Sequence, residues 1–431
     1  MRPHGVVIVG GGLSGLTAAV QLCRLGIAAV VCDAAPELGG RARTAERYGF
    51  HLNYGPHRLY ARGPAVAALR ELDIAIDAAP RGPNGGLAVW RGRKYTLPVG
   101  FCSLMTTDLL PAESKREFAQ LLVSLKGVSL HQLQRVSIAQ WLRTHARDPQ
   151  VKQLVLCMVR NATYCNDPVR MSAAAAIEQL RLSVAGEVLY LHGGWASLVT
   201  ALHTAAIAGG ATIVSGNRVI EIDAIGGRAS HVSLANGVRL PVDAVIIAAA
   251  PRAAQELLQP VTDYQVSTTD VRVATLDVAL RGLPRKRTVF AFGVDEPWSF
   301  SADSVIVRVA PPDKAVVHVV KYLRAGTVGS SDDEQQLEGV LDLLQPGWRR
   351  LIVYRRFVPT LPVAHAMVTA EAGGFEGRPP GRVPQLENVF LAGDWVGPVG
   401  QLADASIASA IAAARSAARM IALETSRHAT H

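Results

Sequence analysis

The chain begins with two short runs of apolar residues, separated by a longer segment in which apolar residues recur at helical spacing. Residues 5–10 read GVVIVG, an unbroken run typical of a strand buried on both faces of a parallel sheet. The next segment, LTAAVQLCRLG at 16–26, has apolar residues at helical spacing and ends on a glycine suited to terminate a helix. A second apolar run, AAVVCD at 28–33, predicts another buried strand. The pattern therefore predicts a strand–helix–strand unit.

The middle of the chain changes to helical periodicity. Four segments place apolar residues at helical spacing: 110–125, 137–146, 148–162 and 171–182. Ser137 and the pair Asp148 and Pro149 are suitable helix starts. Residues 191–224 then predict a Gly-Gly turn, a helix and two strands, and residues 237–258 predict a hairpin-like strand and a buried strand.

The last third of the chain is rich in predicted strands. Three segments alternate or run apolar: 271–280, 304–310 and 315–323, with a turn at 311–314 between the last two. Together they predict an antiparallel sheet. On the third segment, the two-residue period places His318 and Tyr322 on one face and Lys321 on the other. The chain then continues with a predicted strand, NVFLAG at 388–393, a polar loop and a helix rich in alanine and serine.

The size and composition of the chain indicate a two-domain globular protein. It has 431 residues, more than one core usually serves, with 49% hydrophobic and 18% charged residues. Its longest apolar stretches are too short to cross a bilayer, and its start lacks the pattern of a secretory signal. An odd number of cysteines without a CxxC pair indicates reduced thiols in the cytoplasm and no metal site: Cys23, Cys32, Cys102, Cys157 and Cys165.

The net charge of +9 does not by itself indicate a nucleic-acid partner. The basic residues are scattered, apart from LPRKR at 283–287 and the arginine pairs at 349–350 and 355–356, and no nucleic-acid-binding motif accompanies them. We therefore expect no nucleic-acid partner, while peripheral contact with a membrane surface stays open.

The glycines of the first turn carry the clearest chemical signal. Gly10, Gly12 and Gly15 form a GxGxxG pattern between a predicted strand and a predicted helix, and Asp33 ends the next strand. In this context the first glycine forms the tight turn, the second lets a pyrophosphate approach the backbone, and the third allows close packing of helix on strand. The helix N-terminus faces the phosphates and the acid binds a ribose hydroxyl. The unit predicts a dinucleotide site.

The residues after this unit distinguish among dinucleotides. A nicotinamide enzyme usually continues with a second mononucleotide-binding half, whereas here ELGGRART and GFHLNYGPHRLY follow. With this order of motifs the chain resembles the flavoprotein superfamily of amine oxidases, protoporphyrinogen oxidases and phytoene desaturases. The block GDWVGPVGQLADA at 393–405 looks most like the bacterial phytoene-desaturase-like branch.

The resemblance implies FAD as the cofactor, bound non-covalently because no cysteine precedes the Gly-Asp block in the pattern of covalent attachment. It implies an α/β fold with a discontinuous Rossmann-type FAD-binding domain, residues 1–80, 190–265 and 385–431. A substrate domain of antiparallel sheet and helices would comprise 81–189 and 266–384. The residues implied in FAD binding are Gly10, Gly12, Leu13, Ser14, Gly15, Asp33, Gly39, Gly40, Arg41, Gly55, Pro56, His57, Val219, Gly393, Asp394, Leu402 and Ala403.

Three positions depart from the superfamily. Arg272 stands where amine oxidases often have a lysine near the flavin, and Gln401 stands where they place an aromatic residue of the amine cage. Both departures count against simple amine oxidation. The ribose-binding acid is Asp33 where a glutamate is usual, and its shorter side chain still accepts hydrogen bonds from hydroxyl groups.

The resemblance implies an FAD-dependent dehydrogenase, desaturase or oxidase that removes hydride from a largely apolar small molecule. Alternatives are an amine or amino-acid oxidase that releases peroxide, a flavin-dependent isomerase, and a flavin-binding protein without catalysis. An amino-acid substrate would need an arginine for its carboxylate, and Arg160, Arg272 and Arg308 are candidates. Neither the electron acceptor, dioxygen or a quinone, nor the oligomeric state follows from the sequence. Candidates for a catalytic or orienting role are His57, Arg160, Tyr164, Trp195 and Lys321, although a structural role is the commoner one for each.

Overall fold

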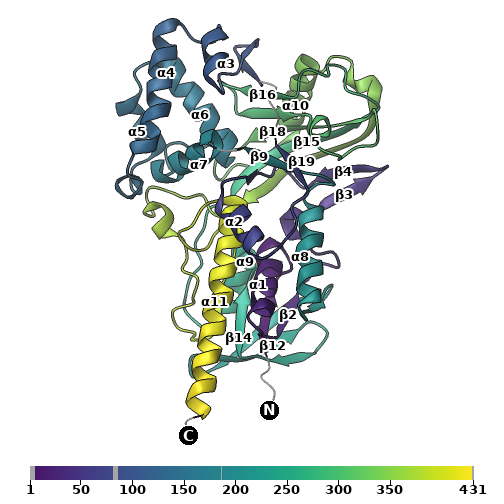
Figure 1. Cartoon of the computed structure of the whole chain (residues 1–431), viewed down its shortest axis with the longest axis vertical. Coiled ribbons are helices and arrows are strands. Elements are labelled where there is room, and N and C mark those ends of the chain that lie inside the picture. Colours follow the sequence, from purple (N-terminus) through teal and green to yellow (C-terminus); the bar gives the residue numbers. More distant parts are fainter. Residues whose placement is uncertain (1–4, 81–85, 186, 430–431) are drawn as a thin grey trace.

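A five-stranded parallel sheet forms the base of the molecule, as seen in the computed structural model, which describes residues 5–80, 86–185 and 187–429 (Figure 1). Its strands come from the start, middle and end of the chain. In spatial order they are β10 (Thr212–Val214), β2 (Ala29–Cys32), β1 (Val6–Val9), β14 (Ala244–Ile247) and β20 (Val389–Leu391). Each neighbouring pair is parallel, so their carboxyl ends meet at one edge of the sheet.

Both faces of this sheet are covered, which explains the unbroken apolar run of β1. Val6 and Ile8 pack in one core, and Val7 and Val9 pack in another on the opposite face. The first core contains helices α1 (Leu13–Arg24), α2 (Pro64–Glu71), α8 (Ala196–Ala208) and α11 (Leu402–Ala429). The second core lies under α9 (Pro251–Leu258) and a three-stranded sheet of β11 (Val219–Ile225), β12 (Arg228–Leu234) and β13 (Arg239–Pro241).

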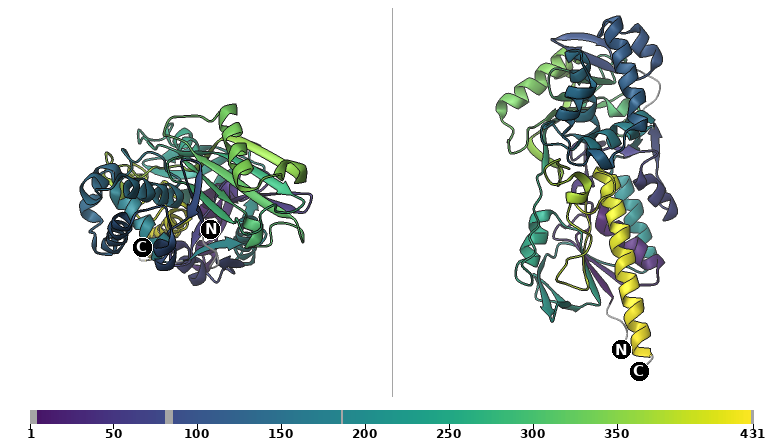
Figure 2. Two further views of the ribbon diagram at one scale, coloured as in Figure 1. Left: turned by 90° about the horizontal axis from the view of Figure 1, so that it is seen from above. Right: turned by 90° about the vertical axis from the view of Figure 1, so that its left-hand side faces the viewer.

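A seven-stranded, mostly antiparallel sheet forms the other large layer (Figures 1 and 2). Its order is β19 (Ile352–Ala364), β15 (Val271–Leu280), β18 (Ala315–Tyr322), β17 (Trp298–Ser301), β16 (Phe290–Gly293), β7 (Leu87–Trp90) and β8 (Arg93–Thr96). Helix α10 (Ser331–Leu344) packs against β15 and β18. Beside the sheet lie α3 (Phe101–Thr106), α4 (Ala112–Ser124), α5 (Ile138–His145), α6 (Pro149–Thr163) and α7 (Ala173–Ala185).

Short strands connect the two parts. Strands β3 (Thr44–Arg47) and β4 (Phe50–Asn53) form a hairpin, and β5 (Leu59–Tyr60) and β6 (Ala78–Pro80) pair with β9 (Val188–Leu191). The structure thus contains the predicted combination of parallel and antiparallel sheets in an α/β fold, and the four predicted helices α4 to α7. Ser137 and Asp148 cap α5 and α6 by accepting hydrogen bonds from Gln140 N and Gln150 N.

One predicted strand is wrong. Residues 304–310 form no strand: a 3₁₀ turn at Asp303–Val305 leads into irregular chain. The alternating apolar pattern there has a different cause, since Val307 and Val309 are buried against Phe50 of β4. The place beside β18 is taken instead by β17, which the sequence pattern did not predict.

Helix α11 combines length and apolarity. Residues Leu402–Arg427 meet the length and composition of a membrane-crossing helix, but half of their most apolar window is buried inside the protein. Ala410, Ala414 and Ala417 are fully buried in the core that α11 shares with α1 and α2. Packing against these helices accounts for the small apolar residues, as in the core helix of a globular protein.

Candidate cofactor and substrate site

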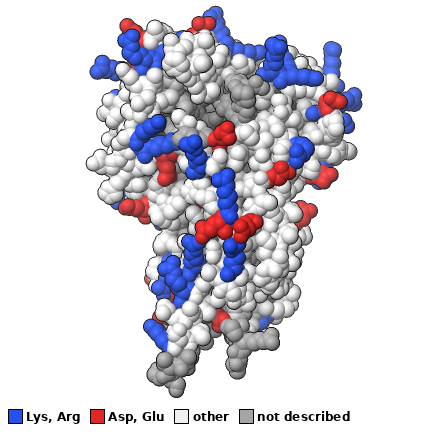
Figure 3. Space-filling model, in the orientation of Figure 1, with Lys and Arg blue, Asp and Glu red and all other residues white. Residues whose placement is uncertain are grey.

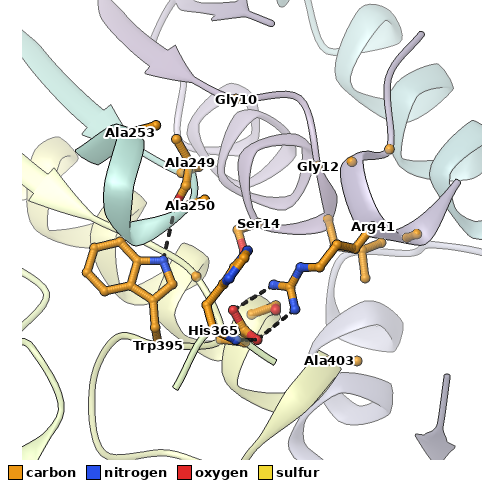
Figure 4. A pocket seen from close by; sticks show the side chains of 18 of the residues that line it. Gly10, Gly12, Ser14, Arg41, Ala249, Ala250, Ala253, His365, Trp395 and Ala403 are labelled. Atoms are coloured by element: carbon orange, nitrogen blue, oxygen red, sulfur yellow. Dashed lines mark hydrogen bonds and ion pairs between the residues drawn. The ribbon is translucent and has the colours of Figure 1, made fainter. Parts of the chain in front are cut away.

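A large cavity opens at the carboxyl edge of the parallel sheet. Its volume is about 490 Å³, and its lining comes from segments far apart in the chain. Figure 4 shows these segments converging: the turn after β1, the helical turn at Arg41, the start of α9, and the chain around His365 and Trp395. All of the predicted FAD-binding residues border this cavity except Gly15 and Gly55.

The three glycines of the first turn differ in what surrounds them. Gly10 adopts φ +108°, which favours glycine. A Cβ on Gly15 would lie 1.8 Å from the carbonyl oxygen of Gly10, so α1 packs directly on the turn. A Cβ on Gly12 would have only the carbonyl oxygen of Gly39 nearby, at 3.9 Å, and would otherwise enter the cavity. The protein thus keeps open, at the N-terminus of α1, the space that a pyrophosphate would need.

Asp33 is fixed as an acceptor at the end of β2. One carboxylate oxygen accepts a hydrogen bond from Gly11 N at 2.5 Å and the other from Ala35 N at 2.7 Å. Each oxygen retains a further lone pair, and the side chain borders the cavity, as Val219 does at the start of β11. This arrangement fits the binding of ribose hydroxyl groups.

Arg41 and Asp394 join the first and last segments of the site. Their side chains form a bidentate ion pair with N–O distances of 2.8 and 2.6 Å, drawn as dashed lines in Figure 4. The backbone N–H of His365 also donates to Asp394, at 2.9 Å. Burial raises the pKa of the Asp394 carboxyl, but Arg41 and His365 together outweigh burial and hold this pKa below its usual value. Arg41 keeps a third of its side-chain surface accessible and borders the cavity.

The opposite end of the cavity is formed by His57, Trp195 and the start of α11. The His57 and Trp195 rings lie 4.8 Å apart between centroids. Burial lowers the pKa of His57 to about 4, so its ring is neutral near pH 7, with its two nitrogens 2.9 and 3.0 Å from the carbonyl oxygens of Gly55 and Arg41. Leu402 and Ala403, the first residues of α11, border the cavity and direct a helix N-terminus at it.

These features fit FAD. The cavity offers an open glycine turn for a pyrophosphate, a fixed carboxylate for a ribose, a partly exposed arginine, and a helix N-terminus where a flavin ring gains negative charge on reduction.

A small second cavity of about 60 Å³ adjoins the first and borders the antiparallel sheet. Its walls carry aromatic side chains of Tyr190, Phe290 and Phe292. Five residues border both cavities: Pro56, His57, Arg58, Tyr164 and Trp195.

Arg58 is a partly buried cation with no carboxylate partner in the described ranges. One terminal nitrogen donates to the amide oxygen of Asn161, the guanidinium lies 5.6 Å from the centroid of the Tyr164 ring, and Nε is buried without a partner. The hydroxyl of Tyr164 is also buried and has no hydrogen-bond partner among the described residues. Burial raises the pKa of Tyr164 well above its usual value, and its backbone has φ +60°, rare for a bulky residue. Both side chains thus hold unused hydrogen-bonding capacity beside the cavities.

A buried charge network lies behind the second cavity. Asp277 accepts from His318 Nδ1 at 2.7 Å and from Arg356 at 2.7 and 3.0 Å, and Thr275 donates to it as well. Burial alone would raise the pKa of Asp277 and lower that of His318. Their mutual hydrogen bond, together with the charges of Arg356 at Asp277 and of Asp303 at His318, reverses both directions: the pKa of Asp277 is lowered and that of His318 is raised. The network links β15, β18 and β19, and it presents the His318 ring to the second cavity beside Asp303.

The remaining predicted residues lie away from the main cavity. Arg160 donates to the carbonyl oxygen of Val294 at 2.8 Å, and Lys321 pairs with Asp333 of α10 on the outer face of the sheet. Arg272 pairs with Asp270, and Arg308 is exposed and pairs with Asp77. Gln401 donates to the carbonyl oxygen of Ala175.

Sequence reasoning missed Arg58, His365, Trp395 and the alanines after β14. For Ala248, Ala249 and Ala250 a signal existed: β14 was predicted as a buried strand, and its carboxyl end meets the edge where β1 ends. Trp395 donates to the carbonyl oxygen of Ala249 at 3.1 Å, which joins this loop to the Gly-Asp segment.

This chain has relatives among known protein families and curated proteins. The profile of a family described as flavin containing amine oxidoreductase matches residues 13–274. A hydroxyneurosporene desaturase of Rubrivivax gelatinosus is 27% identical over 57% of this chain and 53% of its own length. An L-amino-acid oxidase of Crotalus adamanteus is 29% identical over 32% of this chain and 27% of its own length. The chain thus matches about half, or less, of the length of these curated relatives.

The fold is also found in solved structures. The crystal structure of an oxidoreductase from Methanosarcina mazei has a TM-score of 0.75 and 18% identity, and it covers 94% of this chain and 99% of its own. The resemblance expected from the glycine turn, the GGR segment and the Gly-Asp block is confirmed. The chain belongs to the flavin-containing amine oxidoreductase family.

Proposed function

We propose that the protein is an FAD-dependent oxidoreductase acting on a largely apolar small molecule that carries an anionic group, such as a carboxylate. The observation that carries the substrate class is Arg58, a cation that lies beside an aromatic-lined cavity and has no carboxylate partner among the residues the structure describes. FAD, when bound, supplies the chemistry by accepting hydride from a C–H bond of the substrate.

We assign the cofactor to the main cavity. Gly12 and Arg41 would hold the pyrophosphate, Asp33 a ribose, Val219 the adenine, and the start of α11 the pyrimidine edge of the flavin ring. The segments 1–80, 190–265 and 385–431 would then act as the FAD-binding domain, and 81–189 and 266–384 as the substrate domain.

The chain's own residues would bind and orient the substrate. A charge placed out of water without a partner is unfavourable, and an anionic ligand at Arg58 offsets that unfavourable free energy. Neither a hydrocarbon without polar groups nor a simple ammonium compound provides this compensation. Tyr164 would donate its free hydroxyl to the same ligand, while Trp195 and Phe292 exclude water from the reacting C–H bond.

An amino-acid oxidase is the second candidate, favoured by the same arginine. One relative is named an L-amino-acid oxidase, and a carboxylate is common to all amino acids. Arg58 would fill the role for which Arg160, Arg272 and Arg308 were considered, since none of those three borders either cavity. Formation of peroxide with amino acids, and not with polyenes, would distinguish it; a product of unchanged mass would indicate an isomerase.

The five cysteines are free, which supports a reducing compartment such as the cytoplasm.

The test of the substrate class compares acids with their uncharged analogues. The holoprotein would be titrated anaerobically with arylalkanoic acids, polyene acids and amino acids, each beside its carboxamide, while the flavin absorbance is followed. We expect acids to bind at least about tenfold more tightly than amides, a difference of about 1.4 kcal/mol. Arg58→Met should remove this preference and Arg58→Lys should retain part of it. Equal binding of acids and amides by the unmodified protein would refute the anionic substrate.

A further inference from the structure

Two smaller cavities lie behind the α11 end of the main cavity. An outer cavity of about 210 Å³ is bordered by Arg170, Thr268, Met367 and Arg378, among others. An inner cavity of about 10 Å³ lies between it and the main cavity. The inner cavity shares Ala366 and Met367 with the outer one, and Asp394 and Leu402 with the main one. Among the described residues, the outer and main cavities share no lining residue, so the inner cavity lies between them and borders on both.

The inner cavity offers apolar and sulfur surfaces. Cys165, Met171 and Met367 border it, and the Cys165 and Met367 sulfur atoms lie 3.3 Å apart. Burial raises the pKa of Cys165 to about 12, so its thiol is uncharged. The polar side chains at this cavity are already engaged: both oxygens of Asp394 are bound by Arg41, and the Gln401 amide donates to the carbonyl oxygen of Ala175.

Size limits what can pass. A volume near 10 Å³ accommodates about one water-sized particle. Because the Asp394 carboxylate and the Gln401 amide nitrogen are engaged elsewhere, such a space offers water little and favours a small apolar molecule. A quinone ring or an organic substrate is too large to enter without rearrangement of the core.

Met367 is placed to control this connection. Its backbone N–H is held by the carbonyl oxygen of Thr269 at 2.7 Å, and its side chain is 7% exposed. The side chain borders both the inner and the outer cavity. Because methionine is unbranched and changes rotamer readily, a fixed backbone with a movable thioether suits a gate.

We propose that these two cavities form a passage for dioxygen, gated by Met367, which leads from the outer cavity to the α11 end of the main cavity. The inference rests on the proposed function, because that end is where the flavin ring is assigned. Dioxygen arriving there would take two electrons and two protons from the reduced cofactor and leave as hydrogen peroxide. The passage would supply dioxygen as the electron acceptor, and larger acceptors would have to enter the main cavity directly.

The test separates acceptors by size and needs no substrate. The flavin of the holoprotein would be reduced photochemically, and its reoxidation by dioxygen or by dichlorophenolindophenol followed by stopped-flow absorbance. We expect Met367→Trp to slow reoxidation by dioxygen at least about tenfold, a rise of about 1.4 kcal/mol in the barrier. Reoxidation by the indophenol should change less than about twofold, and the matched control Met367→Leu, similar in volume, should leave both rates within that range. Ala366→Leu is a second blocking variant should the tryptophan prevent folding.

A structural readout complements the rates. Crystals of the holoprotein pressurised with dioxygen should show a dioxygen molecule in the inner cavity, and crystals of the blocking variant should not. The passage is refuted if the blocking variants leave the dioxygen rate unchanged, if they slow both acceptors equally, or if the unmodified protein reacts with dioxygen no faster than free reduced FAD. Absence of bound flavin would instead refute the proposed function, so the two failures are distinguishable.

Discussion

At the scale of single residues, the three glycines of the first turn show how one motif combines different physical requirements. Gly15 is required by the protein itself, because any side chain there would overlap the Gly10 carbonyl group. Gly12 faces open space in the protein, so a side chain there would occupy room that a ligand can use. The structure thereby assigns a role in folding to Gly15 and a role in ligand binding to Gly12.

This separation leads to a paired prediction. Gly12→Ala should fold with nearly unchanged stability of the apoprotein but bind FAD at least about tenfold more weakly, because the added methyl group occupies pyrophosphate space. Gly15→Ala should lower the stability of the apoprotein by about 1–3 kcal/mol through overpacking. Thermal unfolding of both apoproteins and FAD titration followed by flavin fluorescence would check this. The assignment fails if Gly12→Ala binds FAD normally.

Arg58 illustrates a limit of sequence reasoning at the same scale. It directly follows the Gly-Pro-His segment that was recognised, yet a single arginine in a loop carries no pattern. Arg58 is important because no carboxylate of the described residues lies within ion-pair distance of it. Only the packed structure reveals this absence. Lys321 is the opposite case. The sequence pattern predicted which face of β18 it lies on, but only the structure shows that it forms an ion pair with Asp333 of α10 on the outer face of the sheet.

At the scale of helices and strands, the sequence predicted an element correctly where its apolar pattern arose only from packing of that element against a core. The buried runs of β1, β2 and β14, and the periodic segments of α4 to α7, formed as expected because their apolar faces meet a core. Segment 304–310 has the alternation of a strand but packs by its valines against β4 without joining a sheet. An alternating pattern of apolar residues shows that one side of a segment is buried. To become a strand of a sheet, the segment must also form hydrogen bonds with a neighbouring strand that has a free edge, and the local sequence does not encode this.

Helices α2 and α11 are coupled through one buried carboxyl group. Asp404, in the first turn of α11, accepts a hydrogen bond from Ala65 N at 2.8 Å, at the start of α2. Burial raises its pKa from 3.8 to about 6. The folded protein therefore binds this proton more tightly than the unfolded chain does. The contribution to stability is complete below about pH 4 and is lost as the pH rises through about 6.

Asp404→Asn should accordingly stabilise the protein in a pH-dependent manner. The amide oxygen keeps the hydrogen bond from Ala65 without a buried charge, so we expect the variant to be more stable at pH 8 by up to about 3 kcal/mol. The gain should vanish near pH 4. Denaturant unfolding between pH 4 and pH 8 would measure it. A variant that is less stable at pH 8 would mean that the two helix N-termini stabilise the ionised carboxylate more than burial disfavours it.

At the scale of the whole molecule, the fold serves to bring distant segments of the chain to one cavity. Strands β1, β14 and β20 lie side by side although they come from the start, middle and end of the chain, and the Arg41–Asp394 ion pair joins the outermost of these segments (Figures 1 and 4). The basic side chains on the face shown in Figure 3 are dispersed among acidic and uncharged ones. Contact with a membrane surface stays a prediction for experiment.

The central claim is that one extended FAD molecule lies across this cavity and contacts both ends of the chain. The crystal structure of the protein purified with its flavin tests it most directly. We expect a single FAD with its pyrophosphate at Gly12, its adenosine ribose at Asp33 and its flavin ring beside Leu402 and His57. An FAD bound outside the cavity, or one that touches only the glycine turn and not the segment from Asp394 to Ala403, would contradict the account.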